Sequence, residues 1–135
     1  MIGKEIFFIM SYVKSFKELE VYKLSRELAK EIFILSKTFP HEEKYSLTDQ
    51  MRRSSRSVGA QIAEAWGKRK YERHFITKLT DADAEQLEKQ HWLETAHECD
   101  YLDSKNVDLL LNKCESIGKM LQTMMDKSSL FCSKN

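Results

Sequence analysis

Glycine and proline are so scarce in this chain that long helices are the simplest structure open to it. The 135 residues include only 4 glycines and 1 proline, too few for the many tight turns of a sandwich or a barrel. Apolar residues recur three or four positions apart through most of the sequence, which is the repeat of an amphipathic helix. We therefore expect one all-α domain, an up-down-up-down antiparallel four-helix bundle.

Local signals place the first two helices. Ser15 opens the S-x-x-E pattern of a capping box, so the first helix is expected to begin there. It is expected to end before Pro40, because the residue preceding a proline disfavours the helical region. The second helix is expected to be capped by the segment 46–49 and to run to Trp66, with Gly67 as its C-cap.

The third and fourth helices follow from the same periodicity. The third is expected over Tyr71–Cys99, with Gln86 and Gln90 forming hydrogen-bonded layers inside the bundle. Its apolar side is expected to comprise Phe75, Ile76, Leu79, Ala82, Leu87 and Leu93. The fourth helix is expected over residues 104–127, with Asp103 or Ser104 as its N-cap.

The two ends of the chain lie outside this pattern. Residues 1–15 are expected to be a poorly ordered extension of the bundle at 16–127, and the tail 128–135 is expected to fray. The apolar run Ile6–Met10 is shorter than a membrane span or a signal-peptide core, and Met10 is an alternative initiator. Three cysteines without metal-like spacing indicate free thiols in a reducing compartment, so we expect a cytoplasmic protein with no membrane partner.

The second helix has an unusual outer side. Its inner face is expected to carry Leu47, Met51, Ser54, Ser55, Val58, Ile62 and Ala65. Its outer side begins with Arg52, Arg53 and Arg56 and ends with the small residues Gly59, Ala60 and Ala63. Glycine costs about 1 kcal/mol relative to alanine inside a helix. Gly59 is therefore either a tolerated glycine or a point where another backbone approaches closely.

A second stripe on the first helix, formed by Tyr22, Ala29 and Phe33, points away from the expected core. A bundle buries one broad face of each helix, so these rings either contact another subunit or pack on the next helix. The subunit alternative predicts a homo-oligomer, whose interface would comprise Tyr22, Ala29, Phe33, Gly59, Ala60 and Ala63.

A dense group of cations is the best candidate for binding nucleic acid. It comprises Arg52, Arg53, Arg56, Lys68, Arg69, Lys70 and Arg73, and arginine matches the geometry of phosphate. Two hypotheses remain open, because the acidic run Asp81, Asp83, Glu85 and Glu88 on the third helix could neutralise the same arginines. Tyr71 is the one aromatic residue near the cations that could stack on a base.

No pattern in the sequence indicates catalysis. Glu88 and His91, like Glu94 and His97, have the E-x-x-H spacing of di-iron bundles. Both pairs lie on one expected helix, however, and no acidic residue on the other core stripes complements them. Nucleophile elbows and phosphate loops are missing from the sequence. We expect no catalytic residue, no metal and no cofactor.

Short sequence pieces spread over residues 16–127 carry a family resemblance. They are Phe16–Leu19 with Val21 and Tyr22, Phe39 and Pro40 with Tyr45 and Leu47, Gln50–Arg53, Ser57–Ala65, Leu79–Asp83, Glu85, Trp92 with Leu93, and Tyr101 with Leu102. In these pieces the chain resembles the small bacterial bundles that include the 23S rRNA intervening-sequence proteins. It has Gln61 where that family usually has asparagine, and Ala84 where glycine is frequent.

The resemblance implies a ring-shaped homo-oligomer, typically a pentamer, without known catalytic activity. A relative of similar fold, the accessory variability protein of diversity-generating retroelements, binds nucleic acid and a reverse transcriptase through a basic surface. The net charge of this chain is +1, so such binding would need a local basic patch. The leading expectation is a non-enzymatic homo-oligomeric bundle that binds RNA or an RNA-associated protein. The alternative is a protein-only scaffold whose charged stripes serve subunit contacts.

Overall fold

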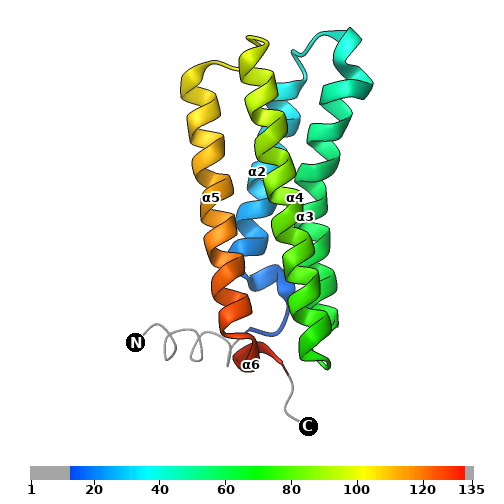
Figure 1. Cartoon of the computed structure of the whole chain (residues 1–135), viewed down its shortest axis with the longest axis vertical. Helices are drawn as coiled ribbons and strands as arrows, with labels where there is room; N and C mark the ends of the chain where they lie inside the picture. Colours follow the sequence, from blue (N-terminus) through cyan, green and yellow to red (C-terminus); the bar gives the residue numbers. More distant parts are fainter. Residues whose placement is uncertain (1–12, 133–135) are drawn as a thin grey trace.

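The computed structural model describes residues 13–132, and every regular element in that range is helical. Four long helices stand side by side with alternating directions: α2 (Glu20–Ser36), α3 (Asp49–Gly67), α4 (Glu72–Glu98) and α5 (Ser104–Asp126) (Figure 1). The predicted four-helix bundle is thus confirmed. The predictions for residues 1–12 and 133–135, including the alternative start at Met10, lie outside the described residues.

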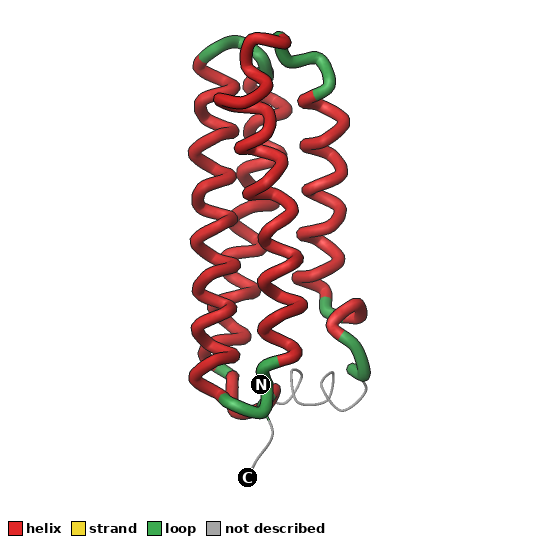
Figure 2. The backbone as a smooth tube through the Cα atoms, turned by 90° about the vertical axis from the view of Figure 1, so that its right-hand side faces the viewer, coloured by secondary structure: helices red, strands yellow, loops and turns green. Residues whose placement is uncertain are grey.

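Short connections join the helices at the two ends of the bundle (Figure 2). The turns from α2 to α3 and from α4 to α5 lie at one end, and the turn from α3 to α4 lies at the other. Around the bundle, α3 packs between α2 and α4, and α5 packs against α4 and α2. No helix in the described range is long and apolar enough to cross a membrane.

One continuous apolar core runs along the bundle axis. Its fully buried members include Leu28, Ile32, Met51, Val58, Ile62, Phe75, Leu79, Leu93, Ile117 and Leu121. Leu87, which was predicted to belong to this core, is 54% exposed. The prediction was wrong because Gln86 takes the inward position, and the next residue on a helix lies about 100° further round.

The start of α2 differs from the capping-box prediction. Ser15 caps only a 3-10 turn, Phe16–Glu18, and its hydroxyl accepts a hydrogen bond from the backbone N–H of Lys17 at 3.2 Å. Leu19 is then extended, with φ −67° and ψ 130°, and α2 begins at Glu20. Ser15 therefore caps a turn that precedes the helix.

The start of α3 also lacks the predicted cap. A 3-10 turn (His41–Glu43) and a π turn (Lys44–Thr48) lead directly into the helix, and Ser46 lies within the π turn. The N–H of Asp49 already donates to the carbonyl of Lys44. The preceding turns thus supply acceptors that a capping side chain would otherwise provide.

The C-terminal end of α3 is satisfied by an arginine. Gly67 is the last helical residue, and none of the described glycines has a positive φ, so the predicted glycine cap is wrong. The Nε of Arg69 instead donates to the carbonyl of Trp66 at 2.9 Å. The end of α4 does use the left-handed conformation, at Asp100 with φ 62°.

The last described residues fold onto the bundle. The predicted fourth helix begins after Asp103, whose carboxylate accepts from the N–H of Asn106 at 2.7 Å. Beyond it, the short helix α6 (Ser128–Phe131) places Phe131 against Phe75, with ring centroids 5.9 Å apart. The prediction that the chain frays after residue 127 is wrong for this segment, because Phe131 is buried.

Candidate nucleic-acid interface

A groove runs between α2 and α3, and Gly59 is buried where side chains of α2 contact α3. A Cβ added to Gly59 would lie 3.3 Å from the Oγ of Ser25 and 3.6 Å from the Cε1 of Tyr22. Gly59 is thus closely surrounded, but the atoms nearest to it are side-chain atoms of α2 in the same chain, whereas the prediction was an approaching backbone. Gly59, predicted to be a subunit contact, thus serves a contact within the protomer.

Further along this groove, cations from two helices surround the ring of Phe33. The guanidinium carbon of Arg52 lies 4.7 Å from the ring centroid, and that of Arg56 lies 5.4 Å from it. The Nζ of Lys37 lies 4.9 Å from the same centroid. Such distances are typical of cation–π contacts. The Nε of Arg52 also donates to the Oγ of Ser36 at 2.8 Å, which fixes its orientation.

This arrangement corrects the prediction that Tyr71 is the only aromatic residue placed to stack among the cations. Tyr71 is 54% exposed and contacts Lys70, whose Nζ lies 5.7 Å from its ring. Phe33 was missed because it belongs to a different helix from the arginines. The signal in the sequence that could have linked them is that Phe33 and the arginines both lie outside the core stripes of their helices.

Two clefts open on either side of Phe33. One, of about 680 Å³, is lined by Arg26, Lys30 and Arg56 together with Glu27. The other, of about 600 Å³, is lined by Arg52, Arg53 and Arg56 together with Asp49. Phe33 and Arg56 line both clefts, so cations and an aromatic ring share one surface.

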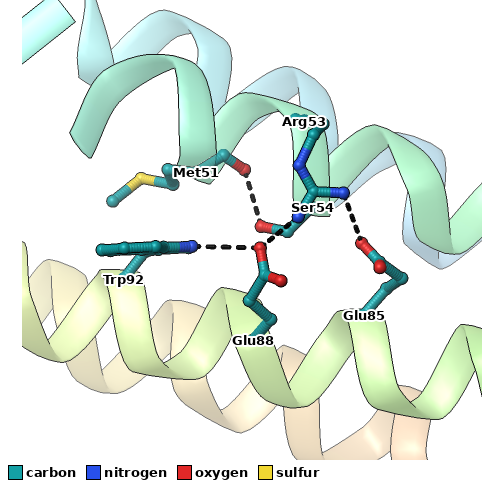
Figure 3. A network of polar contacts seen from close by, with 6 residues as sticks. All are labelled: Met51, Arg53, Ser54, Glu85, Glu88 and Trp92. Atoms are coloured by element: carbon teal, nitrogen blue, oxygen red, sulfur yellow. Dashed lines mark hydrogen bonds and ion pairs between the residues drawn. The ribbon is translucent and has the colours of Figure 1, made fainter. Parts of the chain in front are cut away.

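On the side of α3 that faces α4, two glutamates neutralise Arg53 (Figure 3). Arg53 forms ion pairs with Glu85, at 3.2 Å, and with Glu88. Glu88 also accepts from the indole N–H of Trp92 at 3.1 Å. Partial burial lowers the pKa of Arg53, but the nearby carboxylates outweigh that effect and hold it above its usual value. The charge-pairing hypothesis therefore holds for Arg53.

The rest of the acidic run has other partners. Asp83 accepts from Gln86 at 2.9 Å, and Gln86 accepts from Gln90 at 2.7 Å, which confirms the predicted hydrogen-bonded layer. Asp81 lies 3.9 Å from Lys78. Among the ion pairs of residues 13–132, none involves Arg52 or Arg56.

The predicted basic set therefore divides into two groups. Lys68 follows Arg56 by 12 residues, which corresponds to about 18 Å along a helix axis. Lys68, Lys70 and Arg73 are exposed where α3 turns into α4. Arg69 stacks on Trp66, 3.6 Å from the ring centroid, and its burial lowers its pKa.

The other residues predicted to contact a second subunit are spread along α2 and α3. Tyr22 packs edge-on against Phe16, with ring centroids 4.9 Å apart, and is half-buried. Ala29 and Ala63 are half-buried, and Ala60 is exposed. Their role between subunits stays a prediction.

The histidines of the two E-x-x-H pairs have other contacts. The ring of His91 contacts Trp92, with centroids 4.7 Å apart, and the Nδ1 of His97 lies 3.0 Å from the carbonyl oxygen of Leu102. Within the described residues, no three side chains of histidine, cysteine, aspartate or glutamate gather as metal ligands would.

Lys89 has a buried amine that the sequence did not reveal. Its side chain in α4 is fully buried, and its Nζ has no hydrogen-bond partner among the described residues. Burial lowers the pKa of Lys89, while the sulfur of Cys114 on α5 acts in the opposite direction. Lys89 follows Gln86 by three residues and therefore lies on the same inner side of α4. This spacing was the signal in the sequence that could have indicated its burial.

Comparisons with known proteins agree with this fold. A family model described as 23S rRNA-intervening sequence protein matches residues 17–123. The chain is also similar to a crystal structure of a protein of unknown function from the S23 ribosomal protein family of Bacteroides thetaiotaomicron. The two are 31% identical with a TM-score of 0.71, and the match covers 78% of this chain and 95% of the other. No curated protein matches the chain.

Proposed function

We propose that this chain, which belongs to the 23S rRNA-intervening sequence protein family, is a non-enzymatic homo-oligomeric bundle that binds RNA in the cytoplasm. The observation that carries the proposal is the position of Arg52 and Arg56. Both guanidinium groups lie beside Phe33 at the surface, and neither forms an ion pair with a carboxylate in the described chain.

Guanidinium groups without a carboxylate partner are well suited to phosphate. Each presents a planar fork of donors that matches two phosphate oxygens. Lys30 and Arg26 line the adjacent cleft and extend the positive surface along α2. The surface is local, because the whole chain has a net charge of only +1.

A homo-oligomer would strengthen such binding. A ring of subunits, with a pentamer as the expectation from the family resemblance, repeats the basic surface around one axis. Weak contacts on several subunits then act together on one RNA molecule. The predicted contacts between subunits remain Tyr22, Ala29, Phe33, Ala60 and Ala63.

A protein-only scaffold is the second candidate, and the α3–α4 side favours it. Arg53 with Glu85 and Glu88 shows that charged side chains of this chain hold helices together. The same chemistry could join subunits. Under this alternative, replacing Arg52, Arg53 and Arg56 by alanine dissociates the oligomer, and adding RNA does not change the mass of the protein.

Fluorescence anisotropy with a labelled single-stranded RNA, measured over a range of salt concentrations, tests the proposal. Wild type should bind with an affinity that falls as salt rises, by a slope of about 0.7 per phosphate neutralised. The double variant Arg52→Ala with Arg56→Ala should bind at least about tenfold more weakly, with a slope smaller by about 1.4.

A matched control removes the same charge elsewhere. Lys105→Ala with Lys119→Ala changes two exposed lysines on α5, and this variant should bind like wild type. If wild type does not bind RNA at low salt, the proposed function is wrong. If the two double variants weaken binding equally, the site assignment is wrong.

A further inference from the structure

The ring of Phe33 stands at the boundary of two basic clefts. It lines the cleft that contains Arg26 and Lys30, and it also lines the cleft that contains Arg52 and Arg53. Arg56 lines both clefts, 5.4 Å from the ring centroid. A ligand crossing the groove from one cleft to the other would therefore pass over an aromatic ring flanked by guanidinium groups.

The clefts have the size and charge for single nucleotides. Their volumes of about 680 and 600 Å³ lie within the range of pockets that bind small molecules. Each cleft also contains one carboxylate. Glu27 in the first pairs with Lys113 of α5 at 3.3 Å, and Asp49 in the second is the first residue of α3, where the helix dipole stabilises negative charge. The first cleft therefore has three cations to one carboxylate. In the second cleft Arg53 is already paired with Glu85 and Glu88, which leaves Arg52 and Arg56 against Asp49.

We propose that this groove binds unpaired nucleotides, with a base stacked at Phe33 and the neighbouring phosphates in the two flanking clefts. The inference rests on the proposed function and specifies its ligand as single-stranded RNA. Base-paired nucleotides are already stacked within a duplex, so they cannot present a free face to the ring. Unpaired bases stack on aromatic side chains and on guanidinium planes.

This inference gives Phe33 a different role from the predicted subunit contact. A ring that receives a base must be accessible in the oligomer. Replacing Phe33 should therefore change RNA affinity and leave the solution mass unchanged, whereas a subunit contact would show the opposite pattern.

The test compares a labelled 20-nucleotide single strand with a blunt duplex of the same sequence. Phe33→Leu keeps the apolar volume and removes the aromatic face, and Phe33→Trp keeps the face. Tyr45→Leu is the matched control, because Tyr45 is an exposed ring beside Lys44 that lines neither cleft. Light scattering and circular dichroism on each variant establish its mass and its helix content.

The inference predicts that wild type prefers the single strand by at least about tenfold. Phe33→Leu should weaken single-strand binding by roughly 5- to 150-fold, the range of one lost stacking contact, with duplex binding and mass unchanged. Phe33→Trp and Tyr45→Leu should bind the single strand like wild type.

Other outcomes separate this inference from the proposed function. If wild type binds both RNAs equally, and only the Arg52→Ala with Arg56→Ala variant weakens binding, the inference is wrong and the proposed function stands. A changed mass for Phe33→Leu would also overturn the inference, because the ring would then be a subunit contact. If wild type binds neither RNA, both are wrong.

Discussion

Two neighbouring arginines, on the two sides of α3, have different kinds of contact. Arg53 faces α4, where Glu85 and Glu88 neutralise it and Trp92 holds one of the carboxylates (Figure 3). Arg52 precedes it in the sequence but faces α2, where it contacts the ring of Phe33 and the hydroxyl of Ser36. Successive residues differ by about 100° around a helix, so one cluster in the sequence becomes two surfaces.

This difference separates charge that holds the bundle together from charge that is available to a ligand. On the α4 side, carboxylates meet Arg53 at hydrogen-bonding distance. On the α2 side, the groove presents an aromatic ring and a hydroxyl to Arg52. The local partner therefore decides the role of each arginine, and the following substitutions test that assignment.

The largest expected effect is the loss of the close contact between α2 and α3. Gly59→Leu places a branched side chain where even a Cβ would lie 3.3 Å from Ser25. It should lower the free energy of unfolding by roughly 3 kcal/mol, the upper end for an overfilled core. Ala60→Leu, at an exposed neighbour, should change it little. Equal midpoints of urea unfolding for the two variants would contradict the described contact.

The inner side of α4 offers a contrast with the paired Arg53. The buried amine of Lys89 has no hydrogen-bond partner within residues 13–132, so Lys89→Met should raise the free energy of unfolding at pH 7 by about 1–3 kcal/mol. Chemical denaturation measures this change. A loss of stability would mean that the amine has a partner or a required role.

The same variant should alter the pH dependence of stability. The pKa of Lys89 is lowered in the folded protein, whereas in the unfolded chain it should be near its usual value of about 10.4. As pH falls below that value, the unfolded chain takes up a proton that the folded chain resists, so wild-type stability falls until the folded pKa is passed. The advantage of Lys89→Met should therefore be smaller at pH 10 than at pH 7. An advantage independent of pH would contradict this account.

Single arginine substitutions should differ by the side of α3 that they affect. Arg56→Ala should weaken RNA binding by roughly 3- to 10-fold, because it removes a guanidinium that has no carboxylate partner among residues 13–132. Arg53→Ala should change RNA affinity by less than about twofold and should cost under about 1 kcal/mol of stability, since its ion pairs are half-exposed. Anisotropy and urea unfolding measure the two effects. A stronger RNA effect from Arg53→Ala would reverse the assignment of the two sides.

The smallest effect is expected from removing the two carboxylates that pair with Arg53. Glu85→Gln with Glu88→Gln removes the carboxylates but keeps acceptors for Arg53 and Trp92. RNA affinity should rise by about two- to fourfold, and the salt slope should increase by about 0.7 for one additional available cation. Gln61→Glu adds a carboxylate to α3, so it changes the net charge in the direction opposite to the double variant and serves as a comparison. An unchanged salt slope in the double variant would show that Arg53 cannot reach the RNA.

Sequence periodicity predicted the bundle because α2, α3 and α5 bury residues at three- or four-residue spacing, and α4 repeats its apolar residues this way except between Ala82 and Leu93. It also predicted the cap, as Asp103 or Ser104, and the layer of Gln86 and Gln90, since both depend on residues close in sequence. Leu87 was misplaced because the stripe on α4 contains Gln86 and Lys89 at inward positions.

The candidate site was harder to predict, because it depends on which helix lies beside each residue. The arginines were identified as a group, but their division between Phe33 and the two glutamates follows from the packing of α3 between α2 and α4. Close approach of another backbone at Gly59 was one of two interpretations, and the sequence could not identify α2, whose side chains lie nearest to Gly59. Subunit contacts stay a prediction for the same reason.

Size-exclusion chromatography with light scattering, on wild type mixed with labelled single-stranded RNA at low salt, tests the central claim most directly. The account predicts an oligomer that co-elutes with the RNA, and the Arg52→Ala with Arg56→Ala variant should keep the mass of the oligomer but lose most of the RNA. A monomer, or an oligomer that elutes without RNA, would contradict the proposal that this bundle is a multivalent RNA-binding protein.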